Sequence, residues 1–155
     1  MPAKGGTAAF AAVPGVTEIR PGTYVFNDNM QVVQGVAVPD HLAVTALTTV
    51  ISRASDERCT VDAGSKVFSG DVYPPSLNLR GYGEGFGGPD CYVERMNEEH
   101  GVVHFMAGSA PPIGAKLRLV PNHVCTSVSL SDELVGIRNG RVECVWQVAA
   151  RGKRE

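Results

Sequence analysis

The chain has 155 residues, of which 43% are hydrophobic and 19% are charged, and its formal net charge is −2. This length and composition are those of one folded domain with a hydrophobic core, and they exclude a disordered chain. The scattered Lys and Arg residues form no basic stripe, so we expect neither nucleic acid nor a membrane as a partner.

The sequence also limits the compartment. The first residues lack the charged and then apolar pattern of a secretory signal, and no apolar stretch is long enough for a membrane span. We therefore predict a cytoplasmic protein. The cysteines at positions 59, 91, 125 and 144 lie far apart, without a paired motif, which favours reduced thiols.

Glycine and proline divide the chain into short segments rich in Val, Thr and Ile, which is typical of a mainly β domain. In the first part we expect a strand over 16–20 and a short helix over 30–34, which the polar residues 27–29 would cap. A long strand follows over 42–51, and a short one over 59–61.

Residues 69–90 hold two adjacent prolines and six glycines among scattered apolar residues, which predicts a long surface loop of functional interest. Beyond the loop we expect strands over 92–96 and 102–105, joined by a turn in which Gly101 supplies a positive φ. Alternation over 116–120 predicts a half-buried strand.

The C-terminal part has the clearest local signal. The pair Asn139-Gly140 between 134–138 and 141–149 predicts a β-hairpin with a type I′ turn. The residues at 142, 144, 146 and 148 are apolar and share one face, which we expect to meet the core.

Two soft metal-ligand side chains, His123 and Cys125, lie two residues apart within 120–128. If this stretch is an extended strand, both side chains point to the same face, and imidazole and thiolate suit zinc and its neighbours. Two ligands need further ligands from water, substrate or another chain. The spacing alone favours the alternative, a histidine and a buried cysteine that merely share a sheet face.

Three other motifs carry reactive groups, and for the first two we favour an ordinary surface role. Asp62 and Lys66 flank a flexible segment with Gly and Ser, and Lys66 is either a catalytic lysine or a solvated one at the end of a strand. Glu98-Glu99-His100 pairs acids with a base inside a turn, where adjacent side chains diverge. The segments 5–7 and 20–23 each expose backbone N–H groups beside a hydroxyl, as phosphate-binding loops do.

These motifs occur in a specific order along nearly the whole chain. The ordered set is Gly5-Gly6-Thr7, the run 16–26, the segment 62–66, Glu98-Glu99-His100-Gly101, the run 121–125 and Ala150-Arg151-Gly152. Together they resemble the D-serine dehydratase and D-threonine aldolase-like family, which are fold-type III pyridoxal phosphate enzymes related to alanine racemase. The ordered set is far more specific than any one of its members.

The resemblance implies an N-terminal (β/α) barrel that carries the cofactor and a C-terminal β domain that carries a metal. Residues 1–35 would be a remnant of the barrel's C-terminal end, and residues 36–155 a D-serine dehydratase-like β domain. The implied fold class is mainly β, an antiparallel β-barrel or sandwich-like domain with short helices, preceded by the last strands of the (β/α) barrel.

The resemblance also implies site residues. Gly6, Thr7, Gly22 and Tyr24 match positions that meet the cofactor phosphate, and His123 with Cys125 matches the metal ligands. Cysteine at the second ligand position favours the dehydratase branch and zinc. The implied reaction is elimination or aldol cleavage of a small D-3-hydroxy amino acid, in which the metal acts as a Lewis acid on the β-hydroxyl.

One departure limits these expectations. The family's Schiff-base lysine lies on an early barrel strand, and no lysine here stands in that motif, so the chain alone would lack catalytic residues and activity. The first hypothesis is a metal-binding part that needs a barrel domain in cis or in trans, as a split subunit or a truncated protein. The alternative is a non-catalytic β-barrel binding module without its cofactor half, which would bury an apolar patch by self-association as a homo-oligomer.

Overall fold

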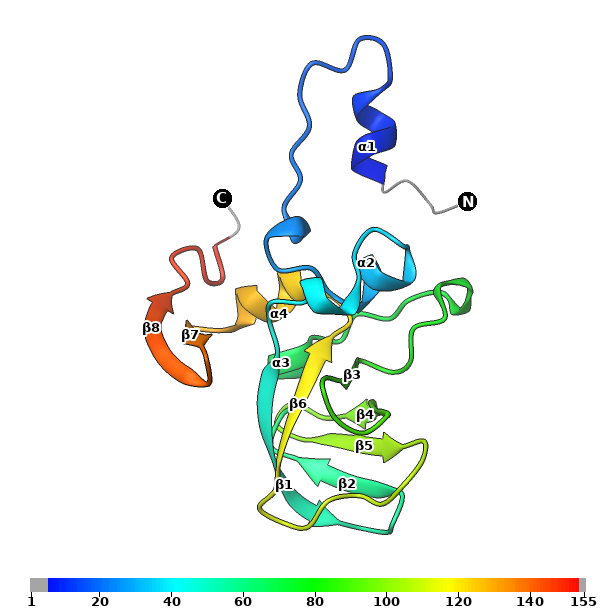
Figure 1. The fold of residues 1–155 in the computed structure, drawn as a ribbon, viewed down its shortest axis with the longest axis vertical. Coiled ribbons are helices and arrows are strands. Elements are labelled where there is room, and N and C mark those ends of the chain that lie inside the picture. Colours follow the sequence, from blue (N-terminus) through cyan, green and yellow to red (C-terminus); the bar gives the residue numbers. More distant parts are fainter. Residues whose placement is uncertain (1–5, 154–155) are drawn as a thin grey trace.

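Six antiparallel strands close into a barrel in the computed structural model, which describes residues 6–153. The strands are β1 (Ala46–Arg53), β2 (Arg58–Val61), β3 (Gly83–Gly85), β4 (Cys91–Met96), β5 (Gly101–Phe105) and β6 (Lys116–Pro121). They pair in the order β1-β2-β5-β4-β3-β6, and β6 pairs with β1 to close the barrel (Figure 1). The predicted mainly β, antiparallel barrel is therefore confirmed.

The barrel interior is filled by alternate residues of the strands. In β6, Leu117 and Leu119 point inward and are buried, whereas Lys116 and Arg118 are exposed. The largest inward side chains of the other strands include Val50, Val61, Val93 and Val103, all fully buried. The predicted strands over 42–51, 59–61, 92–96, 102–105 and 116–120 are confirmed, with small shifts of their ends.

Glycines in and beside the barrel strands allow close backbone contacts. Strand β3 lies within the segment that was expected to be a loop. Its glycines let it approach β6 closely, since a Cβ at Gly83 would lie 2.8 Å from the carbonyl oxygen of Val120 on β6. Gly101 does not have the expected positive φ. It allows the carbonyl oxygen of Ala63 to approach, since a Cβ there would lie 2.6 Å from that atom.

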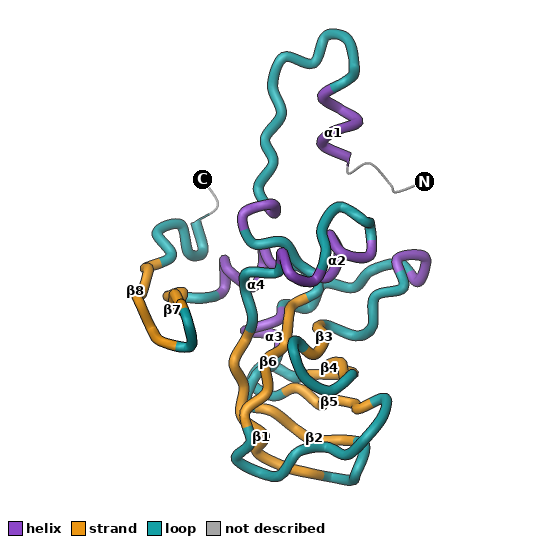
Figure 2. Tube along the Cα trace, in the orientation of Figure 1, coloured by secondary structure: helices purple, strands orange, loops and turns teal. Residues whose placement is uncertain are grey.

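Short helices gather at the end of the barrel where β6 ends (Figures 1 and 2). They are α2 (Asn29–Val33), α3 (Ser65–Phe68) and α4 (Val124–Leu130), with 3-10 turns η1 (Thr23–Val25), η2 (Pro39–His41) and η3 (Pro75–Leu77) in the connecting segments. Helix α2 confirms the expected short helix, and the Asp28 side chain caps it by accepting from the backbone N–H of Gln31. These helices surround the candidate site.

Two segments project away from the barrel. Helix α1 (Gly6–Ala11) and the residues up to 22 form an arm, in which the expected strand over 16–20 is extended but belongs to no sheet of the described residues. The predicted hairpin is confirmed as β7 (Glu133–Arg138) and β8 (Arg141–Gln147). Positive φ at both Asn139 and Gly140 confirms its type I′ turn.

The apolar face of the hairpin does not pack against the core, so the expectation that residues 142, 144, 146 and 148 meet the core is wrong. Val142 and Trp146 are 65% and 57% exposed, and Val135, Ile137 and Val145 are exposed as well. Strands β7 and β8 pair only with each other in the described sheets. The apolar pattern therefore marks a surface that the described residues leave uncovered.

The four cysteines lie within the described residues and are free. Burial is the main cause that raises the pKa of Cys59 and of Cys91 to about 11. None of the helices between residues 6 and 153 combines the length and apolar character that crossing a membrane requires.

Candidate functional site

His123 and Cys125 lie in the connection from β6 to α4. The expectation of one extended strand over 120–128 is wrong, because β6 ends at Pro121 and α4 begins at Val124. His123 is the extended N-cap residue, with φ −134° and ψ 110°, and exposed Cys125 is the second residue of the helix. The two residues therefore lie at the start of a helix and not on a strand.

One distant carboxylate favours this helix start. The Ser127 hydroxyl donates to the carbonyl oxygen of His123 at 3.2 Å, and the Thr126 hydroxyl lies 3.4 Å from the same oxygen. The backbone N–H of Val124 donates to Oδ2 of Asp28 at 3.0 Å. Because the first N–H groups of a helix have no partner inside the helix, an external acceptor stabilises its beginning.

Tyr73, which the sequence did not single out, packs on one of the two candidate ligands. Its ring stacks on the His123 imidazole, with centroids 6.3 Å apart and planes at 7°. Burial is the main cause that raises the pKa of Tyr73 to about 12, and the neighbouring Asp71 contributes in the same direction. The phenol next to His123 is therefore held in its neutral form at ordinary pH.

Further contacts bring two more segments to the start of α4. The Thr23 hydroxyl lies 3.4 Å from Sγ of Cys125. The Thr126 hydroxyl donates to Oδ2 of Asp71 at 2.8 Å, which ties the loop that carries Tyr73 to the helix. Residues from three distant parts of the chain thus surround the candidate pair.

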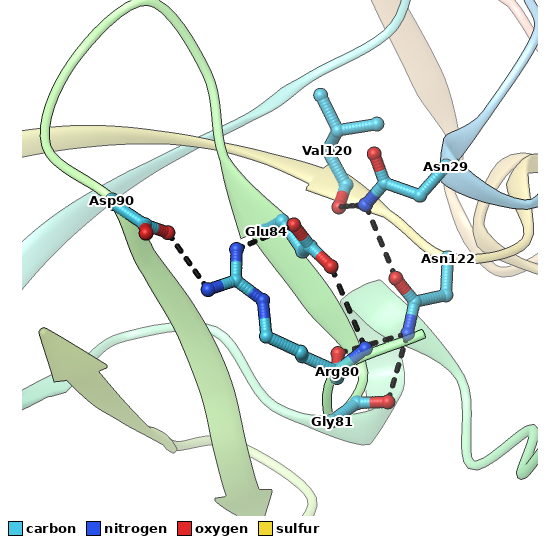
Figure 3. A network of polar contacts seen from close by, with 7 residues as sticks. All are labelled: Asn29, Arg80, Gly81, Glu84, Asp90, Val120 and Asn122. Atoms are coloured by element: carbon cyan, nitrogen blue, oxygen red, sulfur yellow. Dashed lines mark hydrogen bonds and ion pairs between the residues drawn. The ribbon is translucent and has the colours of Figure 1, made fainter. Parts of the chain in front are cut away.

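Asn122 anchors the connection from β6 to α4 within the polar network drawn in Figure 3. Its Nδ2 donates to the carbonyl oxygens of Arg80 and Gly81 at 3.2 and 2.8 Å. Its Oδ1 accepts from Nδ2 of Asn29 at 3.1 Å, and the same Nδ2 donates to the carbonyl oxygen of Val120. This network links α2, the end of the 69–80 segment and β6.

The Arg80 side chain fixes the end of that segment. It pairs with Glu84 at 2.7 Å and with Asp90 at 2.8 Å, and its guanidinium lies 5.4 Å from the centroid of the Tyr92 ring. The hydrogen bond to Glu84 is the main cause that raises the pKa of Arg80. The 69–80 segment is therefore held at both ends, although it has little regular structure.

The donor set suits zinc in kind but is short in number. Imidazole and thiol are the nitrogen and sulfur ligands that zinc prefers. Nowhere in residues 6–153 do three or more His, Cys, Asp or Glu side chains meet in a group that could hold a metal ion. Such a pair leaves coordination positions for water, substrate or groups from elsewhere, as catalytic zinc sites do.

The four residues predicted for the cofactor phosphate are not assembled into a site by any described contact. Gly6 and Thr7 begin helix α1, and the side chain of Thr7, like all of Gly5, lies outside what the structure describes. Gly22 precedes η1 and Tyr24 lies within it, 67% exposed. Their role remains a prediction that depends on a further domain.

The other reactive motifs lie on the surface. Lys66 forms an ion pair with Glu99, and this hydrogen bond raises the pKa of Lys66, opposite to what a nucleophilic lysine needs. His100 is exposed and lines a hollow of about 410 Å³ on the barrel's outer side with Arg95 and Met96 among its neighbours. Glu99 thus pairs with Lys66, and the structure gives it no bond to His100.

Comparison with known proteins adds the family. Residues 43–137 match the family described as "Putative serine dehydratase domain". A D-threonine aldolase of Arthrobacter sp. is 39% identical over 153 residues, which are 95% of this chain and 38% of the aldolase. An uncharacterised protein of Mycobacterium tuberculosis is 32% identical over 134 residues, covering 83% of this chain and 98% of that protein.

Solved structures agree with the sequence comparison. A D-threo-3-hydroxyaspartate dehydratase matches 86% of this chain and 39% of its own, with 30% identity and a TM-score of 0.74. That structure is a metal-free form in which a cysteine is replaced by alanine; in another, a histidine two positions earlier is replaced. The chain spans about two fifths of the length of these enzymes.

Proposed function

This chain belongs to the serine dehydratase domain family, and from that premise we propose that it is the metal-carrying β domain of a D-3-hydroxy amino acid dehydratase or aldolase. The relatives that support this are an aldolase and a dehydratase of D-configured 3-hydroxy amino acids. Because the chain matches only part of each, the activity belongs to the chain together with a (β/α) barrel domain, in cis or in trans.

The observation that carries the proposal is the position of His123 and Cys125. Both lie at the start of α4, where His123 stacks on Tyr73 and Sγ of Cys125 lies 3.4 Å from the Thr23 hydroxyl. Their two-residue spacing equals that of the histidine and the cysteine replaced in the two dehydratase variants, and the cysteine variant is the metal-free form. We assign both side chains as ligands of one divalent metal, with zinc favoured by a nitrogen and sulfur donor pair.

The chain's own residues hold and orient the metal. Pyridoxal phosphate on the barrel domain would withdraw electrons from the substrate Cα, and the metal would polarise the β-hydroxyl as a Lewis acid. Tyr73 packs against one face of the His123 imidazole and so limits the orientation of that ring. The Thr23 hydroxyl lies within hydrogen-bond reach of Cys125 Sγ and is available to donate to a thiolate there.

The proposal gives the N-terminal region a separate role. Residues 1–35 would belong to the end of the (β/α) barrel and residues 36–155 to the β domain, with Gly6, Thr7, Gly22 and Tyr24 near the cofactor phosphate. In support, the arm exposes Phe10 and Ile19, at 64% and 41%, as a segment awaiting a covering domain does. A reducing, cytoplasmic compartment fits the four free cysteines.

Two measurements test the proposal. Zinc binding to the wild-type chain is compared with binding to a His123→Ala, Cys125→Ala double variant, and a Cys144→Ala variant serves as the matched control. We expect zinc to bind the wild type and the control and to be lost from the double variant. Zinc that the double variant retains would refute the site.

The second measurement uses a chimera. The chain replaces the matching C-terminal part of the Arthrobacter D-threonine aldolase, and aldehyde release from D-threonine and keto-acid release from D-3-hydroxyaspartate are assayed. We expect one of the two products, and its loss in the double variant. A folded chimera that binds zinc but yields neither product argues against a catalytic role for this chain.

A non-catalytic interaction module is the second candidate. It is favoured by the exposed apolar side chains of the hairpin and by a relative in Mycobacterium tuberculosis that this chain covers over 98% of its length. This candidate predicts self-association of the chain and no zinc dependence. Sedimentation of the wild-type chain with and without zinc separates the two candidates.

A further inference from the structure

Asp28 is a fully buried carboxylate that joins two helices. Its side chain is 0% exposed. Oδ1 accepts from the backbone N–H of Gln31 in α2, and Oδ2 accepts from the backbone N–H of Val124 in α4, both at 3.0 Å. Val124 is the residue between His123 and Cys125, so one carboxylate oxygen holds the peptide group that joins the first proposed ligand to the residue before the second.

We propose that Asp28 is a positioning residue for the metal pair, which it holds by fixing the Val124 peptide between the ligands. This inference rests on the proposed function, because it takes His123 and Cys125 as the ligands. Asp28 itself is not one of the metal ligands. It acts through the backbone, at a site 96 residues away in the sequence.

The choice of residue type supports this role over simple capping of α2. An N-cap needs one acceptor, and Asn or Ser supplies it as well as Asp does. Burying a carboxylate is costly unless both oxygens find donors. Among residues 6–153 the second oxygen has its donor at Val124, so a carboxylate at position 28 is explained by the α4 contact and not by α2.

The position of the contact sets the size of the expected effect. The Asp28 carboxylate lies behind the peptide of the ligand pair and is fully buried, so water cannot replace it as acceptor for the Val124 N–H. Groups that orient metal ligands from behind typically change metal affinity by about 10- to 100-fold when they are removed.

The test uses two variants that break the contact from opposite ends. In Asp28→Asn, the amide oxygen still caps Gln31, but the amide nitrogen then faces the Val124 N–H. Val124→Pro removes the N–H itself; proline is favoured at the first helical position, and the extended His123 suits a residue before proline. Asn29→Ala is the matched control, because it cuts the neighbouring link from α2 to Val120 and Asn122 and leaves Val124 untouched.

The readouts are zinc affinity by competition with a chromogenic chelator, and the visible and near-ultraviolet absorption of the cobalt-substituted chain. We expect zinc affinity to fall about 10- to 100-fold in both contact variants and to change less than about threefold in Asn29→Ala. The cobalt bands, which report ligand geometry, should change in the contact variants alone. A merely structural role would shift the melting temperature without altering these bands.

The outcomes separate this inference from the proposed function. Zinc binding that survives His123→Ala, Cys125→Ala refutes the proposed function and the inference with it. Binding that the double variant loses but both contact variants keep refutes the inference alone. An equal loss in Asn29→Ala would show that α2 docking matters and the Val124 contact does not. If both contact variants unfold, the contact serves the fold, and the positioning role is rejected.

Discussion

Protection of Cys125 from alkylation is a direct prediction of the metal site. The chain offers four thiols in different environments: Cys125 is exposed, Cys144 is half-buried, and Cys59 and Cys91 are buried. Iodoacetamide reacts with thiolates. We expect it to modify Cys125 first in the zinc-free chain and to modify it slowly once zinc is bound, with Cys144 unaffected by zinc.

The magnitudes follow from the structure and from mass action. Burial is the main cause that raises the pKa of Cys59 and Cys91 to about 11, against 9.0 for an ordinary thiol. At pH 8 these two cysteines therefore hold about 100-fold less thiolate than an ordinary cysteine, and they serve as internal unreactive controls. At a free zinc concentration of ten times Kd, the unliganded fraction and hence the alkylation rate of Cys125 fall about 11-fold.

The assay is a time course at pH 8 with peptide mapping by mass spectrometry, which follows each cysteine separately. His123→Ala is run in parallel, because loss of one of two ligands should abolish protection at the same zinc concentration. Equal rates for Cys125 with and without zinc, in a chain whose Cys59 and Cys91 stay unmodified, would refute Cys125 as a ligand. Protection of Cys144 to the same degree would point to unspecific zinc binding.

Three further predictions test the fold around the site. Gly81→Ala should destabilise the chain by at least about 3 kcal/mol, because φ is +48° and the new Cβ would lie 1.8 Å from the Val93 carbonyl oxygen. Denaturant unfolding measures this change. In the control Gly88→Ala the new Cβ has no atom within 4 Å, and stability should change by less than about 0.5 kcal/mol. Arg58→Gln should raise the pKa of Glu94, which the hydrogen bonds from Arg58 hold below 4.5. A carboxylate with a lowered pKa stabilises the fold above its unfolded pKa and loses that effect as the pH falls through its folded pKa. The variant should therefore be less stable than the wild type above about pH 5, and this difference in unfolding free energy should disappear on acidification. A difference that does not depend on pH would contradict the prediction. Gly136→Ala should shift the fluorescence of Trp146, the one tryptophan of the chain, because the new Cβ would lie 2.8 Å from the indole; an unchanged emission spectrum would contradict the packing of the hairpin.

Most barrel strands and the hairpin were predictable because their signal is local. Alternation in 116–120 and the Asn139-Gly140 pair each reflect a period or a turn that neighbouring residues decide. Strand β3 was not predictable in the same way. Gly83 and Gly85 carry no strand propensity, and they belong to the barrel because only glycine fits against β6 and β4.

The candidate ligands were found from the sequence, but their geometry was not. A run with Val, Cys, Thr and Ser has the propensity of a strand, and an extended 120–128 was the condition under which the spacing places both side chains on one face. The bond from the Val124 N–H to Asp28 stabilises a helix start there instead. A tertiary contact over 96 residues leaves no trace in a local pattern.

The burial of the hairpin's apolar face was predicted wrongly for a similar reason. Apolar alternation shows that a face is buried in some context, and it does not say which surface covers it. Here the hairpin, the arm and the helices around His123 and Cys125 all lie toward one end of the molecule, while the barrel occupies the other (Figure 1). A barrel domain placed over that end would cover the apolar side chains and bring further groups to the metal pair together. Burial of the hairpin and completion of the site are then one event, so Trp146 emission should move to shorter wavelength in the chimera whenever zinc-dependent activity appears.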